Sequence, residues 1–197
     1  MPVYMSSLLT LTDELGHNNV FISIYENDSN DKTPVMLQRL DEELARRGVR
    51  RRIMSTKQSE STQQLERIER LSVYRNFAMA PINDAVPEGL DGRPFDKVIW
   101  INDVVFEPNT VHELLDTEGG EFDQACAMDF CCLGFYDTWV MRDADGKTTR
   151  PFWPYFKSRR DRTAVADGFP VPVNSCWNGI TAVSYTHLRA HETEADL

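Results

Sequence analysis

Histidine, cysteine and long apolar runs are scarce in this chain of 197 residues, which has four histidines and four cysteines. The cysteines lack the paired CxxC spacing and the neighbouring histidines of a zinc site. No stretch approaches the roughly 18 to 20 apolar residues of a membrane span. The N-terminus also lacks a charged region followed by an apolar signal core. The sequence as written therefore predicts a soluble chain without a structural zinc centre.

Positively charged residues are also fewer than negatively charged ones. The chain has 21 Lys and Arg against 31 Asp and Glu, a formal net charge of -10 and a pI near 4.9. A general electrostatic affinity for nucleic acid or for an anionic membrane is therefore disfavoured, although a local basic site is not. The remaining composition, 41% hydrophobic and 26% charged, is typical of a soluble globular domain.

The C-terminal residues 183–197, VSYTHLRAHETEADL, differ from the rest because they have no apolar period. Residues 183–193 resemble the translation of a transposase-type sequencing-library adapter. We therefore expect one domain over residues 1–182 and a non-native tail over residues 183–197. His187 and His191 fall in this tail, so we exclude them as metal ligands or bases.

The four cysteines leave the redox state open. Cys126 lies in an expected strand and is most simply a small core residue. A disulfide between Cys176 and either Cys131 or Cys132 is conceivable in an oxidising compartment. The sequence alone does not decide between these interpretations.

Hydrophobic periodicity predicts helices at about residues 4–15, 34–47, 60–80 and 108–115, and strands at about residues 20–25, 49–54, 98–101, 122–128 and 179–182. This alternation is typical of an α/β fold, with a mixed, mostly parallel sheet and helices on both faces. Residues 130–178 are rich in aromatic residues and turns, which indicates a binding loop or lid. Their aromatic side chains are suited to stacking on a sugar or base, or to packing a minor core.

The stretch FDKVIWINDVVFEPN, residues 95–109, is central to the functional interpretation. Its apolar run at residues 98–101 predicts a strand buried on both faces, which ends at Asn102 and Asp103. Ligands of open α/β sheets bind beyond the carboxyl ends of strands, so Asp103 is placed to hold a metal or a phosphate. The alternative is a simple turn before the helix that starts at Pro108.

Two further polar clusters follow expected strands, at residues 26–33 and at Asp129. If the strands are parallel, all three clusters converge at one sheet edge. Carboxylate oxygens suit Mg²⁺ or Mn²⁺, which would neutralise a diphosphate, although solvation also relieves their repulsion.

Six ordered stretches carry a resemblance to a known family: FISIYENDSNDKT, RIERLSVYRNFAMAPI, FDKVIWINDVVF, QACAMDF, FYDTWVMRDADGK and VPVNSCWNGITA. They resemble the fungal capsule-associated α-1,3-mannosyltransferase family over most of residues 3–182. The resemblance implies a GT-A glycosyltransferase fold, a GDP-mannose donor, a glycan acceptor, a divalent metal (Mn²⁺ or Mg²⁺) and a single-pass Golgi membrane protein. It also implies that the catalytic domain is truncated at both ends and lacks its membrane anchor. An inactive fragment is therefore an alternative to an active enzyme.

The resemblance assigns roles residue by residue. Asp103 would be the metal ligand of an Asp-x-Asp-like position, although Asn102 and Val104 stand where two further acids are expected. The nucleotide-sugar site would comprise Tyr25, Glu26, Ser29, Asp31, Arg75, Asn76 and Asn102. Asp129 and Asp137 are candidates for catalytic contacts with the sugar or acceptor, and Trp177 and Asn178 for the acceptor side.

Structural roles compete with two of these assignments, because Arg75 also suits a helix cap or ion pair and Asp137 also suits an ion pair with Arg142. An enzyme that retains the α-configuration can lack a distinct protein base, with the leaving diphosphate assisting proton transfer. Two alternative functions are a nucleotidyltransferase of related fold, disfavoured by the acidic loop after the first strand, and a non-catalytic nucleotide-binding or interaction fragment.

Overall fold

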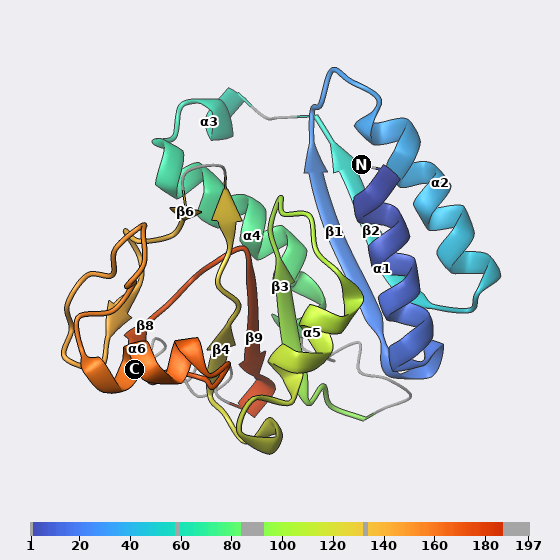
Figure 1. The fold of residues 1–197 in the computed structure, drawn as a ribbon. Coiled ribbons are helices and arrows are strands. Elements are labelled where there is room, and N and C mark those ends of the chain that lie inside the picture. Colours follow the sequence, from blue (N-terminus) through green and yellow to red (C-terminus); the bar gives the residue numbers. More distant parts are fainter. Residues whose placement is uncertain (1, 58–59, 84–92, 132–133, 187–197) are drawn as a thin grey trace. The chain divides into compact units, whose positions relative to one another are not determined.

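The computed structural model describes residues 2–57, 60–83, 93–131 and 134–186 (Figure 1). The chain forms two compact units, Met1–Phe95 and Asp96–Leu197. Each unit is described separately below.

The first unit is built on two parallel strands joined by a helix. Its elements are α1 (Pro2–Leu15), η1 (His17–Asn19), β1 (Phe21–Asn27), α2 (Thr33–Arg46), β2 (Arg50–Thr56), α3 (Glu60–Gln63) and α4 (Arg67–Asn83). Strands β1 and β2 pair in parallel from Phe21↔Arg50 to Asn27↔Thr56. Helix α2 packs on β2 and α4 packs on β1. This unit confirms the βαβ alternation predicted from the sequence.

The sequence of helix α2 carries local signals for its start, its buried face and its end. Pro34 occupies the first turn, where its missing N–H removes no helical hydrogen bond. Leu37, Leu40 and Leu44 recur at helical spacing, and all three side chains are buried. Gly48, at φ 72°, adopts the left-handed conformation just after the helix, which favours glycine.

The helix predicted over residues 60–80 is instead two helices, α3 and α4, and the second continues through Pro81. Pro81 lies in the last turn of α4, so only one backbone hydrogen bond is lost and the helix persists for two more residues. The predicted loop at residues 83–94 falls largely outside the described residues.

The second unit contains a three-stranded sheet of order β3-β9-β4. Its elements are β3 (Lys97–Ile101), α5 (Pro108–Leu115), η2 (Thr117–Gly120), β4 (Gln124–Cys126), β5 (Phe130–Cys131), β6 (Gly134–Phe135), β7 (Arg142–Asp143), α6 (Arg159–Ala166), β8 (Val173–Ser175) and β9 (Ile180–Ser184). Both β3 and β4 run antiparallel to β9. They therefore run in the same direction as each other, and their carboxyl ends flank the start of β9 (Figure 1).

A mixed α/β fold is confirmed, but the described strands do not form a mostly parallel sheet. The β1-β2 pair is parallel, whereas the pairs β3-β9, β4-β9, β5-β6 and β7-β8 are antiparallel. The most buried strand is β9, while every residue of β3 is only half-buried. An apolar run predicts a strand, but its direction and its position in the sheet depend on a distant partner.

Residues 130–178 are more ordered than the sequence pattern predicts. They contain the pairs β5-β6 and β7-β8 and helix α6, whose N-cap Ser158 accepts a hydrogen bond from the backbone of Asp161. Phe135, Met141 and Phe156 form a small buried core, so a minor core is confirmed for part of this segment. Other aromatic side chains remain exposed: Phe130, Tyr136, Trp139, Phe152, Trp153 and Phe169.

The sheet includes part of the stretch that resembles an adapter. Val183 pairs with Val98, and Tyr185 is buried and donates its backbone N–H to the oxygen of Asp96 at 3.0 Å. The non-native origin of residues 183–197 stays a prediction, because backbone pairing does not depend on where a sequence comes from. None of the described helices is both long and apolar enough to cross a membrane.

Candidate functional site

The end of β3 is fixed by Asn102, which follows the strand directly. Its backbone N–H donates to the oxygen of Gly179 at 2.9 Å, and its side-chain Nδ2 donates to the backbone oxygen of Asn178 at 2.9 Å. Its Oδ1 accepts from the indole Nε1 of Trp100, also at 2.9 Å. Asn102 thus ties the end of β3 to the segment that leads into β9, and it leaves the next residue, Asp103, exposed.

The end of β4 is fixed from the same segment. Ala127 donates its backbone N–H to the oxygen of Ile180 at 3.0 Å, and its own oxygen accepts from Nδ2 of Asn178 at 2.8 Å. Asn178 is completely buried. It therefore links the ends of both flanking strands, through its backbone oxygen to Asn102 and through its side chain to Ala127.

Asp129 lies three residues beyond β4, and its backbone oxygen accepts from the N–H of Tyr136 at 3.0 Å. This hydrogen bond brings the adjacent Asp137 to the same place. The Oδ1 atom of Asp129 is buried and has no hydrogen-bond partner among the described residues. A buried oxygen of this kind is costly unless a ligand, ion or water satisfies it.

Three carboxylates interact at this edge. The pKa of Asp137 is raised from 3.8 to about 6. Burial is the largest cause, followed by the negative charge of Asp129, a hydrogen bond to Asp129 and the charge of Asp103. The predicted approach of Asp103 and Asp129 is found within this unit. The third predicted cluster, residues 26–33, belongs to the first unit, so its convergence with them stays a prediction. The physical reason for the approach of the two aspartates is the antiparallel β9 between the two strands, because β3 and β4 both end where β9 begins.

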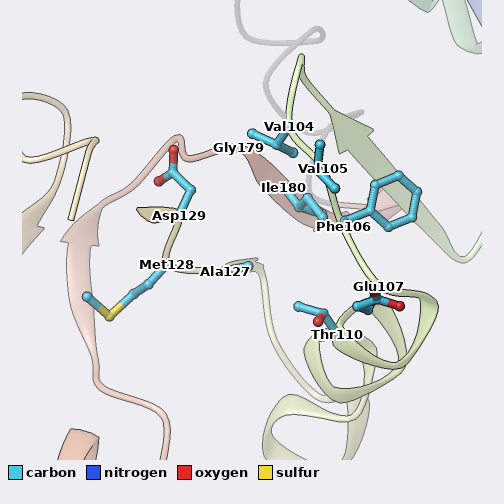
Figure 2. Close-up of a pocket in the computed structure, with 10 residues that line it drawn as sticks. All are labelled: Val104, Val105, Phe106, Glu107, Thr110, Ala127, Met128, Asp129, Gly179 and Ile180. Carbon is cyan, nitrogen blue, oxygen red and sulfur yellow. The ribbon is translucent and has the colours of Figure 1, made fainter. Parts of the chain in front are cut away.

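A hollow of about 250 Å³ adjoins this edge (Figure 2). It is lined by residues 104–107, Thr110, residues 127–129, Gly179 and Ile180. Figure 2 shows the Asp129 side chain across the hollow from Glu107 and Thr110. Among the described residues, no Lys, Arg or His lines it.

Close packing shapes the hollow at Gly179. A Cβ atom on this residue would lie 2.5 Å from Cγ1 of Val104 and 3.3 Å from Cβ of Asp129. Glycine is therefore needed here for close approach, because the residues after β3 and β4 meet over its backbone.

A disulfide joins Cys126, the last residue of β4, to Cys176. The pairing of Cys176 with Cys131 or Cys132 considered from the sequence is therefore not found, and Cys126 is more than a small core residue. Cys131 is an exposed free thiol, and Cys132 lies outside the described residues. The cross-link anchors the segment that carries Trp177 and Asn178 to the strand that leads to Asp129.

The acceptor-side assignment of Trp177 and Asn178 is untested, but their contacts are structural. The Trp177 ring packs against the Trp100 ring, with 5.8 Å between their centroids. The alternative ion pair of Asp137 with Arg142 is not among the interactions of either side chain. Arg142 donates instead to the backbone oxygens of Trp139 and Met141 at 2.7 and 2.8 Å.

The remaining predicted residues belong to the first unit, and several of them make local contacts there. The Tyr25 ring stacks on Phe77, with 4.9 Å between centroids, and its hydroxyl contacts Thr56. Asp31 accepts from the backbone N–H of Thr33 at 2.8 Å at the start of α2. Arg75 and Asn76 are exposed on α4.

Glu26 is the most buried of these residues. Burial alone would raise the pKa of its carboxyl, but the hydroxyl of Ser55 and the backbone N–H of Ser29 donate to it, and the net pKa lies below the ordinary value of 4.5. Its two carboxylate oxygens therefore accept hydrogen bonds from Ser29, in the loop after β1, and from Ser55, in the neighbouring strand β2. These contacts suit a role in ordering this loop.

Sequence reasoning missed Val104, Gly179 and the Cys126–Cys176 pair as parts of the site. Only Gly179 could have been found from the sequence. A glycine between a polar residue and a strand-like run indicates a close approach of another part of the chain. The other contributions depend on residues 50 or more positions apart, for which one sequence gives no indication.

Comparison with known protein families finds a match over nearly the whole chain. The family model described as Cryptococcal mannosyltransferase 1 matches residues 1–194. No curated protein and no solved structure matches the chain. The chain belongs to this mannosyltransferase family, which indicates a glycosyltransferase-type enzyme acting on a sugar donor and an acceptor.

Proposed function

We propose that the chain forms part of a GT-A-type catalytic domain that transfers a mannosyl group from GDP-mannose to a glycan hydroxyl. Family membership supports mannosyl transfer. The guanine nucleotide, the α-1,3 linkage, the divalent metal and a Golgi location rest on the resemblance of the six sequence stretches.

One observation carries this proposal: β3 and β4 both end where β9 begins, which brings Asp103, Asp129 and Asp137 to one sheet edge. Burial, and then the charges of Asp129 and Asp103, raise the pKa of Asp137 to about 6. Repulsion among three acids costs stability, and groups with perturbed pKa values cluster at functional sites. A cation that bridges these carboxylates to a diphosphate would relieve the repulsion.

The donor set fits Mg²⁺ or Mn²⁺ in chemistry, since all three side chains offer hard oxygen ligands. Among the described residues no three His, Cys, Asp or Glu side chains are grouped as ligands that could hold a metal ion directly. A Mg²⁺ ion usually retains several waters and takes one or two carboxylates together with substrate phosphates. Asp103 and the buried, unpartnered Oδ1 of Asp129 are the groups that would hold it.

The bound metal would supply charge neutralisation of the leaving diphosphate. In the transfer, the acceptor oxygen forms a bond to C1 of the mannosyl group, and the bond from C1 to the diphosphate oxygen breaks with its electron pair. GDP leaves, and its phosphate takes up the acceptor proton. The role of the chain is to position the two reactants and to exclude water.

A thermal-shift titration with GDP and GDP-mannose, with and without Mn²⁺, tests this function. A ligand at 100 times its Kd stabilises the folded state by about 2.7 kcal/mol, which for a chain of this size corresponds to roughly 5 to 10 °C in Tm. We expect stabilisation by both nucleotides that increases with Mn²⁺. A folded chain that no nucleotide stabilises would contradict the proposal.

Two variants identify the metal ligand. Asp103→Ala should remove the Mn²⁺-dependent part of the shift, whereas Asp116→Ala, an equally exposed aspartate after α5, should leave it unchanged. If Asp103→Ala binds GDP with Mn²⁺ as the parent does, Asp103 is a turn residue. Release of mannose or its transfer to a mannoside, measured with the parent, separates an enzyme from a non-catalytic nucleotide-binding fragment.

A further inference from the structure

Residues 150–162, RPFWPYFKSRRDR, form a basic and aromatic segment in an otherwise acidic chain. They contain five Lys or Arg residues and one Asp, a net charge of +4, whereas the other 184 residues carry a net charge of -14. Charges on the rest of the chain are largely screened beyond about one Debye length, roughly 8 Å at physiological salt. A partner that contacts this segment therefore meets a cationic surface, although the whole protein is acidic.

The basic side chains of this segment are available to an external anion. Lys157, Arg159 and Arg160 are exposed, and none of the three side chains forms an ion pair or a hydrogen bond with another described residue. Arg159 and Arg160 also occupy the first turn of α6, where the positive end of the helix dipole disfavours cations. Helix stability therefore does not account for them, whereas a negatively charged partner would stabilise both the side chains and the helix end.

Aromatic side chains lie beside these cations in the sequence and pack on one another. The backbone N–H of Arg150 donates to the oxygen of Tyr155 at 2.8 Å, which closes a tight loop. Phe152 and Trp153 lie in this loop, and their side chains are 62% and 55% exposed. The rings of Trp153 and Phe130 both meet the ring of Tyr155, with 5.7 Å between centroids in each pair. Since Phe130 is exposed as well, these rings leave a large apolar area in contact with solvent.

The geometry of the rings distinguishes between candidate partners. The ring planes of Trp153 and Tyr155 meet at 86°, and those of Phe130 and Tyr155 at 60°. The rings thus face in different directions and do not offer one flat platform on which a sugar or a base could stack. A neutral sugar would also leave the cations without a partner. Exposed Phe and Trp rings beside Lys and Arg are instead typical of surfaces that lie in the headgroup region of a bilayer.

We propose that three exposed rings and three cations form a surface that docks on a membrane containing anionic lipids: Phe130, Phe152, Trp153, Lys157, Arg159 and Arg160. The rings enter the headgroup region, and the cations contact the negatively charged headgroups. None of these residues belongs to the proposed metal site, so docking does not require mannosyl transfer. Because Phe130 directly follows Asp129, docking would hold the segment after β4 near the membrane surface.

Sedimentation with lipid vesicles tests this docking surface. The parent chain should bind vesicles of phosphatidylcholine that contain about 30% phosphatidylserine, and it should bind pure phosphatidylcholine at least about tenfold more weakly. Raising the salt from about 0.1 M to about 0.5 M should weaken binding to the anionic vesicles, because the charges are then screened. Equal affinity for both kinds of vesicle, or no binding to either, would overturn the proposal.

A double variant tests the cations. Arg159→Gln/Arg160→Gln should weaken binding to the anionic vesicles about tenfold. The matched control is Arg39→Gln/Arg67→Gln, which removes two exposed arginines from α2 and α4 and changes the net charge by the same amount. The control should change the affinity by no more than about twofold. Equal losses in the two double variants would show that net charge, and not this surface, determines binding.

A second pair of variants tests insertion of the rings. Trp153→Ala should weaken binding about three- to tenfold, because an indole ring favours the membrane interface. Trp139→Ala is the control and should leave the affinity unchanged, since the Trp139 ring is 82% exposed and has no ring contact in the described part of the chain. Unchanged affinity of a folded Trp153→Ala variant would refute insertion.

Trp153→Phe replaces the alanine variant if that one does not fold, because it keeps an aromatic ring next to Tyr155. Vesicles that contain brominated lipid should quench the tryptophan fluorescence of the parent and quench that of Trp153→Phe much less. Equal quenching of the two proteins would place Trp153 outside the bilayer and overturn the proposal.

Polygalacturonate, a soluble acidic polysaccharide, distinguishes a membrane from an acidic glycan as the partner. It offers negative charge without an apolar layer, so it should compete only weakly with the anionic vesicles. Tighter binding to polygalacturonate than to the vesicles would assign the surface to a glycan and refute the membrane.

Discussion

The Nδ2 atom of Asn102 donates a hydrogen bond of 2.9 Å to the backbone oxygen of Asn178, a residue that is completely buried. The bond joins the end of β3 to the segment before β9, 76 positions later in the chain. The resemblance leads one to expect an acid at this position. The hydrogen bond shows what the amide of Asn102 contributes to the site. The amide holds the backbone on which Asp103 is presented.

Asn102→Ala should destabilise the fold by about 1–3 kcal/mol, because it removes one side-chain hydrogen bond to Asn178 and one from Trp100. Urea denaturation measures the change. Asn109→Ala, which removes an exposed hydrogen bond to Glu113 within α5, is the control and should cost no more than about 0.5 kcal/mol. Equal losses in the two variants would show that Asn102 does not join the segments.

The disulfide between Cys126 and Cys176 should contribute strongly to stability. With a sequence separation of 50 residues, the chain-entropy model gives about 4 kcal/mol, and removal of a native disulfide typically costs about 2–5 kcal/mol. Cys126→Ser should lower the free energy of unfolding by such an amount, as chemical denaturation will measure. Cys131→Ser, at an exposed free thiol, should leave it unchanged. A thiol assay that finds Cys126 and Cys176 free in the native protein would contradict the pairing.

Asp137 should destabilise the metal-free protein at neutral pH. Burial and the neighbouring Asp129 and Asp103 raise its pKa to about 6. The native state therefore binds more protons than the unfolded state between about pH 4 and 6, and stability is lost as the pH rises through that window. Asp137→Asn should be more stable than the parent above pH 6, by on the order of 1 kcal/mol after allowance for solvent screening.

Denaturation across pH 3.5 to 8 in the presence of a chelator measures this effect. Asp145→Asn is the control and should lower stability instead of raising it. Lys147 lowers the pKa of Asp145, and the variant loses that interaction. If Asp137→Asn and the parent keep a constant difference across the whole range, the carboxylates do not interact.

Gly179→Ala should cost about 1–3 kcal/mol, since the added Cβ would lie 2.5 Å from Cγ1 of Val104. Truncating the opposing side chain gives the decisive measurement. In the double variant with Val104→Ala, the cost of Gly179→Ala should fall, which a double-mutant cycle detects as a coupling energy of at least about 0.5 kcal/mol. Additive costs would show that the two residues are not in contact.

Local signals account for the elements that the sequence predicted well. Pro34 and Pro108 mark the first turns of α2 and α5, and the stripe of buried leucines in α2 follows the helical period. The candidate residues Asn102, Asp103 and Asp129 were found because polar residues directly follow apolar runs. These inferences need only a few neighbouring residues, so one sequence suffices.

The roles of the candidate residues were harder to predict from the sequence. The ligand contacts of Asn102 and Asn178 stay predictions, and their hydrogen bonds also place both residues in the framework that holds the strand ends. The nucleotide contact of Glu26 likewise stays a prediction, and Ser29 and Ser55 donate to its carboxylate. A polar side chain suited to binding a ligand is equally suited to binding the backbone, and only tertiary contacts distinguish the two.

The sequence by itself determined the alternation of helices and strands, the acidic balance and the family, because composition, periodicity and ordered motifs are properties of the chain. The tertiary structure decided the order β3-β9-β4, the pairing of Cys126 with Cys176 and the hollow beside Asp129. Each of these joins residues far apart in the chain. Strand β9 can pair between β3 and β4 only after the chain has folded back, and this placement brings Asp103 and Asp129 to one edge of the sheet.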